Sequence, residues 1–171
     1  MEDETPPSEQ DDLVSRAPTQ ADLVRLCGAL NERGARYVVI GGLAIIHAGY
    51  LRTTNDVDLL IDTEPANEAK VLDALSAALA DGAARELKVG EVAQYTVVRV
   101  NDEITVDLMH SASGITYFEA SGEIVFRELD GVRIPFASPR LLWLMKRKTH
   151  REKDQVDLIF LRQQFPEVAH D

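Results

Sequence analysis

Asp56 and Asp58 stand two residues apart at the start of an apolar segment, DVDLLI. If this segment is a strand, positions i and i+2 point to one face, so both carboxylates stand side by side while Val57 and Leu59 face the core. Two adjacent carboxylates repel each other unless a cation lies between them. The pair therefore predicts two ligands of a divalent cation, whereas each aspartate alone is typical of a strand entry or an exposed edge strand.

A third carboxylate, Asp107, interrupts the apolar run ITVDLMH. We expect its strand to be the antiparallel neighbour of the strand that begins at Asp56, because that pairing brings the three carboxylates together. Oxygen ligands of this kind suit Mg²⁺ or Mn²⁺. A pair of such ions can activate a hydroxyl and offset the charge of a departing pyrophosphate. On its own, Asp107 is more typical of a hairpin surface.

Residues near the carboxylates have side chains or backbone suited to phosphate. Gly41 and Gly42 follow the strand-like run YVVI and precede a helical segment, so backbone amides could approach an anion there. Arg52 could hold a triphosphate through its planar guanidinium, and the Thr54 hydroxyl could orient it. The ordinary alternatives are a strand-to-helix turn for the glycines and an exposed loop for Arg52 and Thr54.

The hydrophobic pattern predicts the elements that must position these residues. Thr19 and Asp22 resemble a capping box that opens a first helix, which Gly34 ends. The other predicted elements, in chain order, are a strand at 37–40, a short helix at 43–50, a strand from Asp56, a helix at 66–80, hairpins turning at Asn101-Asp102 and Asp130-Gly131, a helix opened by Ser138 and Pro139 and running through His150, and a helix at about 154–164.

This order of elements indicates an α/β (α+β) fold, with a small mixed sheet flanked by helices and further helices at the carboxyl end, rather than a doubly wound sheet. Residues 1–18 hold six carboxylates against a single basic residue, Arg16, and few large apolar side chains. Such a segment cannot offset the entropy of ordering, so it is predicted to be a disordered acidic tail. Residues 19–171 would then form one domain.

Charge and hydropathy limit the classes of partner. The net charge of −11 disfavours broad, non-specific nucleic-acid binding, although six of the 18 basic side chains lie between Arg140 and Lys153, where phosphate could bind. No apolar run approaches the roughly 20 residues that span a bilayer, and the first residues lack the basic and apolar regions of a signal peptide. We expect a cytoplasmic protein with no membrane partner.

Taken together, the stretch YVVIGGLAIIHAGYLRTTNDVDLLID resembles the signature of the DNA-polymerase-β-like nucleotidyltransferase superfamily. Its GG-x-A and R-x-T-x-D-x-D patterns resemble the AbiEii-type toxin group within that superfamily. The resemblance implies the nucleotidyltransferase fold and metal-dependent transfer of a nucleoside monophosphate from a nucleoside triphosphate (NTP), with Asp56 and Asp58 as the metal-binding pair and Asp107 as the third carboxylate. Relatives in this group are toxins that extend the 3′ end of tRNA, usually beside an antitoxin.

The late segment LLWLMKRKTHREKDQVDLIFL is similar to another motif of the group. By that resemblance Lys146 is the phosphate-binding lysine, and Lys148, Asp154 and Asp157 belong to the nucleotide site. A solvated basic helix face with surface ion pairs is the ordinary alternative. The sequence also departs from the superfamily, because Gly42 replaces a hydroxyl residue of the G-S form, and Thr54 is the substitute that we expect.

Three functional hypotheses follow. The preferred one is an Mg²⁺- or Mn²⁺-dependent enzyme that transfers a nucleoside monophosphate from an NTP to a hydroxyl of RNA such as tRNA, possessing a cognate antitoxin. In the second, the acceptor is a partner protein, which the acidic surface favours, whereas the basic run favours RNA. The third is a catalytically idle nucleotidyltransferase-fold module that binds a nucleotide or a partner.

Overall fold

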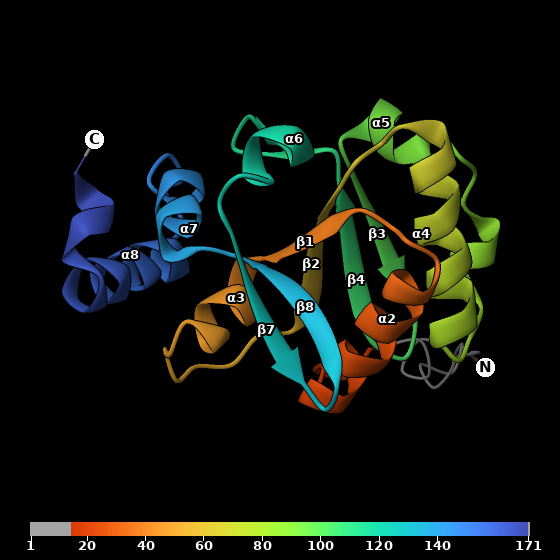
Figure 1. Ribbon diagram of the computed structural model, residues 1–171, viewed down its shortest axis with the longest axis horizontal. Helices are drawn as coiled ribbons and strands as arrows, with labels where there is room; N and C mark the ends of the chain where they lie inside the picture. Colours follow the sequence, from red (N-terminus) through yellow and green to blue (C-terminus); the bar gives the residue numbers. More distant parts are fainter. Residues whose placement is uncertain (1–14, 171) are drawn as a thin grey trace, which may run out of the picture.

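A six-stranded mixed sheet forms the centre of the molecule, and its strands lie in the order β3-β4-β2-β1-β8-β7 (Figure 1). The computed structural model describes residues 15–170. The strands are β1 (Tyr37–Ile40), β2 (Asp56–Ile61), β3 (Val97–Asn101), β4 (Thr105–Met109), β7 (Ile124–Leu129) and β8 (Val132–Ala137), and a separate two-stranded sheet contains β5 (Ser111–Ala112) and β6 (Ile115–Thr116). The predicted α/β class with a small mixed sheet is confirmed.

The two strands that carry the aspartates, β2 and β4, are parallel neighbours. The prediction that they would pair antiparallel is therefore wrong. The chain leaves β2, passes through two α-helices and a 3₁₀ turn, and enters the hairpin of β3 and β4. The second strand of that hairpin pairs with β2. This placement sets β4 parallel to β2 and aligns Asp58 with Asp107 in register.

Helices cover both faces of the sheet. They are α2 (Gln20–Glu32), α3 (Gly41–His47), α4 (Pro65–Ala78), α5 (Glu91–Tyr95), α6 (Tyr117–Ala120), α7 (Pro139–Lys146) and α8 (Glu152–Gln164), with short 3₁₀ turns η1 (Ala83–Glu86) and η2 (Pro166–Ala169). α2 packs against α4, whereas α3 packs against β1, β2 and α7. Figure 1 shows α7 and α8 at one end of the molecule and α4 at the other.

Local signals account for the helix starts. The Thr19 and Asp22 capping box opens α2 as predicted, and Ser138 caps α7 with Pro139 in its first turn. The predicted continuation of α7 through His150 is wrong, because the helix ends at Lys146 and the Thr149 hydroxyl donates to the Lys146 carbonyl. The chain thus turns before α8 begins.

The core lies between the sheet and its helices, and the central strands contribute fully buried side chains. Val57 and Leu59 of β2 are fully buried, as their alternation with the aspartates predicts, and so are Val39 and Leu108 on the neighbouring strands.

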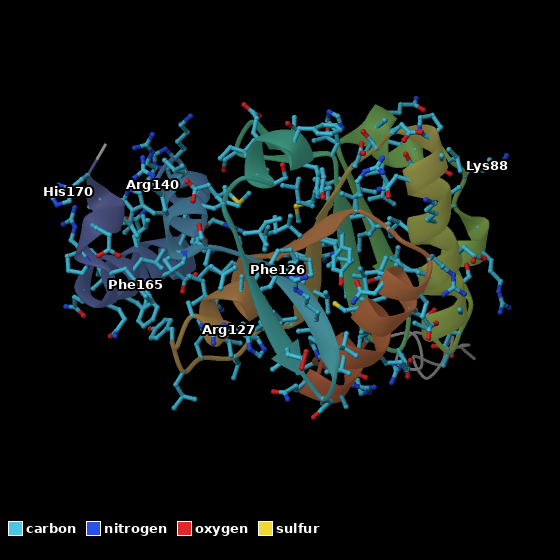
Figure 2. The ribbon with its side chains drawn as sticks, in the orientation of Figure 1. Lys88, Phe126, Arg127, Arg140, Phe165 and His170 are labelled. Carbon is cyan, nitrogen blue, oxygen red and sulfur yellow. The ribbon has the colours of Figure 1, made fainter. Side chains whose placement is uncertain are left out.

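At the carboxyl end, Arg140 of α7 donates to the carbonyl of His170, and both side chains are labelled in Figure 2. This bond ties α7 to the last described residues.

Most of the predicted acidic tail, residues 1–14, lies outside the described residues. Of its last four residues, Arg16 forms ion pairs with Asp22 of α2 and with Glu103. Within the described part of the chain, no helix has both the length and the apolar character needed to cross a membrane.

Candidate active site

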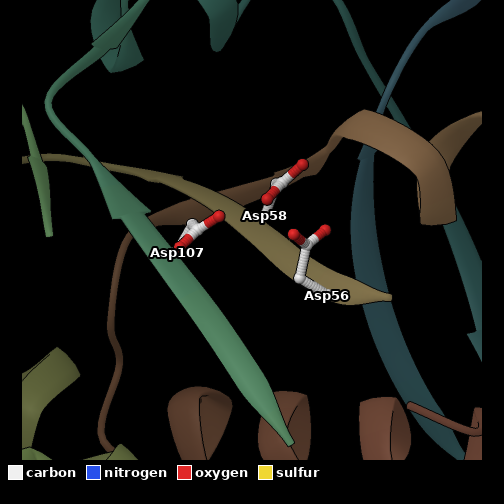
Figure 3. Close-up of side chains that lie close together, drawn as sticks. All are labelled: Asp56, Asp58 and Asp107. Carbon is white, nitrogen blue, oxygen red and sulfur yellow. The ribbon is translucent and has the colours of Figure 1, made fainter. Parts of the chain in front are cut away.

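Three carboxylates converge in the first half of the parallel strands β2 and β4, on one face of the sheet (Figure 3). Asp58 and Asp107 are register partners on the adjacent strands, and Asp56 lies two residues before Asp58 on the same face. One oxygen from each carboxylate lies within 4.8 Å of the others. The residues that the sequence predicted as a cluster are therefore brought together.

Burial and repulsion between the carboxylates both change the pKa of Asp58. Burial, followed by the charges of Asp56 and Asp107, raises the pKa of the Asp58 carboxyl to about 7. An aspartate with such a pKa is poorly stabilised as an anion, because desolvation and like charges both disfavour its ionised form. A cation bound beside Asp58 would therefore favour its ionised form.

Arg99 is a residue of the cluster that the sequence analysis missed. Its Nε donates to Asp107 Oδ1 at 2.9 Å and its Nη2 to Asp107 Oδ2 at 2.9 Å, while Nη2 also lies 3.2 Å from Asp56 Oδ2. The carboxylates raise the pKa of the guanidinium further above its usual value, first through the hydrogen bond to Asp107. The sequence predicted this hairpin with its turn at Asn101-Asp102. In the structure the turn lies at residues 102–104, and the resulting pairing of Asn101 with Thr105 places Arg99 opposite Asp107.

The two glycines begin α3 and lie directly against the carboxylate strand and its loop. Gly41 has a φ of +71°, and a Cβ atom there would overlap the Asp58 carboxylate. A Cβ at Gly42 would lie 2.5 Å from Thr54 Oγ1 and 3.2 Å from an Arg52 nitrogen. Glycine is required at these positions because the side chains of Asp58 and Thr54 fill the space that a Cβ would need.

A second charged cluster is buried beside the first. Lys146 Nζ lies 3.0 Å from Asp154 Oδ1 and 3.1 Å from Asp157 Oδ2. Arg52 donates from Nη2 to Asp157 Oδ2 at 3.1 Å, and its Nε lies 3.0 Å from Oδ1. Both aspartates of α8 are fully buried, so they do not form the surface ion pairs that were the ordinary alternative.

Asp154 is fully satisfied in this second cluster. Burial alone would raise its pKa, but hydrogen bonds from Thr149, Arg151 and Lys146 outweigh burial and lower the pKa to about 2. The Thr149 hydroxyl and Arg151 Nε both donate to Asp154 Oδ2 at 2.7 Å. The turn between α7 and α8 therefore joins both helices to one buried carboxylate.

A cavity of about 170 Å³ lies between the two clusters, and its lining is mostly polar and charged. Its lining residues are Gly41, Gly42, Arg52, Thr54, Asp56, Asp58, Arg99, Asp107, Met109, Lys146, Arg151 and Lys153. Asp154 and Asp157 lie behind this lining, and they form ion pairs with basic side chains that line the cavity. Lys148, predicted to bind nucleotide, is exposed in the turn after α7 and does not line the cavity, whereas Arg151 and Lys153 do.

Comparisons with known proteins identify the family of the chain. A family model described as "Nucleotidyl transferase of unknown function (DUF2204)" matches residues 19–169. No curated protein matches the sequence.

Solved structures share the fold at low sequence identity. The lincomycin-bound lincosamide antibiotic adenylyltransferase LnuA has a TM-score of 0.60 and 14% identity, and the match covers 86% of this chain and 98% of that one. A Thermotoga maritima protein assigned as a nucleotidyltransferase gives 0.52 and 17%, covering 86% and 92%. An antigenic nucleotidyltransferase-like protein from Paracoccidioides brasiliensis gives 0.53 and 15%, covering 87% and 78%.

Proposed function

The chain belongs to the DUF2204 family of nucleotidyl transferases, and on that premise we propose that it transfers a nucleoside monophosphate from an NTP to an acceptor hydroxyl, in a metal-dependent reaction that releases pyrophosphate. The observation that carries this proposal is the convergence of Asp56, Asp58 and Asp107 on one face of the sheet. Nucleotidyl transfer needs positive charge both at the attacking oxygen and at the departing phosphates.

The three aspartates fit Mg²⁺ or Mn²⁺. All donors are carboxylate oxygens, which hard divalent cations prefer, and a cation would favour the ionised form of Asp58, whose pKa is raised by burial and by the neighbouring carboxylates. A metal ion held by these aspartates would supply charge that lowers the pKa of the acceptor hydroxyl and offsets the negative charge on the phosphates.

The chain's own cations can position the triphosphate. Lys146 and Arg52 line the cavity, and each has more N–H donors than its carboxylate partners occupy, so donors remain for phosphate oxygens. Asp157 holds both residues in place, which reduces the entropy lost when a phosphate binds. Exposed Arg151 and Lys153 also line the cavity and would attract the anionic substrate.

We favour an RNA acceptor such as tRNA, because of the basic residues between Arg140 and Lys153 and the AbiEii-type resemblance. That resemblance also extends the proposal to a toxin with a cognate antitoxin. A partner protein is the second candidate, favoured by the net charge of −11. LnuA acts on a lincosamide antibiotic and shares the fold over nearly its whole length, so a small hydroxyl-bearing molecule is also a candidate.

The test is transfer of label from each α-labelled NTP, with Mg²⁺ or Mn²⁺, to total tRNA, cell protein or lincomycin. Asp58→Asn removes one carboxylate, while Asp73→Asn, an exposed aspartate paired with Arg33, makes the same change far from the cavity. We expect label on RNA with the wild type and the Asp73→Asn variant only. Label on protein or lincomycin would reassign the acceptor, and tight NTP binding without transfer would favour the idle module.

A further inference from the structure

Arg99 occupies the position beside the aspartates where a cation is needed. Its guanidinium bonds both carboxylate oxygens of Asp107 and one of Asp56, so it engages two of the three candidate metal ligands at once. Such forked, charge-assisted hydrogen bonds use the same oxygen atoms that a metal ion would need. We propose that Arg99 is a displaceable internal cation, which occupies Asp56 and Asp107 until a divalent metal ion takes its place.

The Arg99 guanidinium offsets part of the negative charge of the three aspartates. Asp58 lies between its two like-charged neighbours, and Arg52 and Lys146, the cations across the cavity, are bound to Asp157 and Asp154. Without a counter-charge, three close carboxylates repel one another. Arg99 reduces that repulsion, and it thereby keeps Asp56 and Asp107 aligned before the ion binds.

Arg99 can leave at low cost because it lies on the edge of the sheet. β3 is the terminal strand in the sheet order, and the Arg99 side chain is 56% exposed. Arg52 provides the contrast, since its side chain is only 19% exposed and its partner Asp157 is fully buried. Water can solvate the released Arg99 guanidinium, whereas moving Arg52 would remove one of the two cations that pair with a fully buried carboxylate.

The inference rests on the proposed function, since it assumes that the aspartates bind a metal ion. The experiment measures Mn²⁺ binding to the full chain by electron paramagnetic resonance of the free ion, without nucleotide. The variants are Arg99→Gln and Arg99→Lys, and the control is Lys153→Gln. Lys153 also lowers the pKa of Asp58 through its charge, so its loss changes the local field without freeing any ligand.

We expect Arg99→Gln to bind Mn²⁺ about tenfold more tightly than the wild type, the gain expected if Arg99 covers the ligands about nine-tenths of the time. Arg99→Lys should fall between them, because an ammonium lacks the fork that engages two oxygens. Lys153→Gln should show a smaller gain that added salt removes. In the absence of metal, Arg99→Gln should melt at a lower temperature than the wild type.

The other possible results separate failure of the proposed role of Arg99 from failure of the proposed metal site. Equal or weaker Mn²⁺ binding by Arg99→Gln, with normal binding by the wild type, overturns the role of Arg99 and leaves the proposed metal site intact. An equal gain in Mn²⁺ affinity in Lys153→Gln would mean that loss of any nearby positive charge has this effect. That result also overturns the role of Arg99. If neither the wild type nor any variant binds Mn²⁺, the metal dependence of the proposed function fails together with the inference.

Discussion

One group of aspartates lines the cavity and a second group is buried behind it, and the two groups differ in how their charge is balanced. Asp154 and Asp157 are fully buried, and Lys146, Arg52 and Arg151 neutralise them. Asp56, Asp58 and Asp107 are closer to solvent and have Arg99 as their only ion-pair partner among the described residues. A balanced buried cluster supports the structure, whereas an unbalanced one has the properties of a binding site for a cation.

The difference in charge balance predicts that one cluster contributes mainly to stability and the other mainly to function. Removing a carboxylate from the balanced cluster leaves buried basic side chains with fewer negative partners, whereas removing one from the unbalanced cluster reduces repulsion between carboxylates. The same Asp→Asn substitution should therefore have opposite effects on stability in the two clusters, and four measurements test this difference.

The largest expected effect is on transfer by Asp58→Asn. Loss of one metal ligand should lower the rate about a thousandfold or more, since the charge it helps to hold contributes several kcal/mol to the transition state. The melting temperature should not fall, because Asn removes a repelling charge. A variant with full turnover, measured beside Asp73→Asn, would remove Asp58 from the site.

Asp157→Asn should show the opposite pattern, with a large loss of stability. It leaves Arg52 and Lys146 short of a buried partner, so we expect the free energy of unfolding to fall by about 3 kcal/mol in urea titrations. Asp73→Asn, which removes an exposed ion pair, should cost less than about 1 kcal/mol. Equal losses in the two variants would mean that the buried cluster contributes no more than a surface pair.

Gly41→Ala tests how closely α3 approaches the aspartates. Its φ of +71° and the overlap of a new Cβ with Asp58 should together cost at least about 2 kcal/mol. Gly34→Ala is a matched control, because Gly34 has a φ of +66° but no atom within 4 Å of the added Cβ. Only Gly41→Ala should also weaken Mn²⁺ binding, and similar effects at both glycines would argue against the close approach.

The smallest effect is a pH dependence of the balanced cluster. The folded-state pKa of Asp154 is about 2, below its ordinary value of 3.8, so its contribution to stability is complete above about pH 4 and is lost as the pH falls toward 2. The difference in urea midpoint between the wild type and Asp154→Asn should shrink over that interval. A constant difference from pH 5 to pH 2.5 would show that the Asp154 charge does not stabilise the fold.

Much of the fold and the candidate site could be predicted from local patterns. The alternation of DVDLLI placed Asp56 and Asp58 on one face, and the turn signals predicted both hairpins. The second hairpin turns at Asp130-Gly131 as predicted, whereas the first turns at residues 102–104. Capping by Thr19 and Ser138 located two helix starts. These signals succeed because strand alternation, turns and caps depend on residues only a few positions apart.

Contacts between distant segments could not be read in the same way. The parallel pairing of β2 with β4 depends on which side of the hairpin joins the sheet, and the pairing of Lys146 with Asp154 and Asp157 depends on the turn that returns α8 under α7. In the sequence, Lys146 and the two aspartates belong to a segment of mixed charge, and only the fold buries them together as ion pairs.

Residue types and their i, i+2 spacing were enough to identify the candidate ligands of a metal ion and of phosphate, because they define the chemistry of a side chain and the face of a strand on which it lies. That Arg99 pairs with the aspartates and that Lys148 lies outside the cavity lining became evident from the fold. Charges interact through space, so the charge balance at each carboxylate depends on neighbours that the fold brings from other elements.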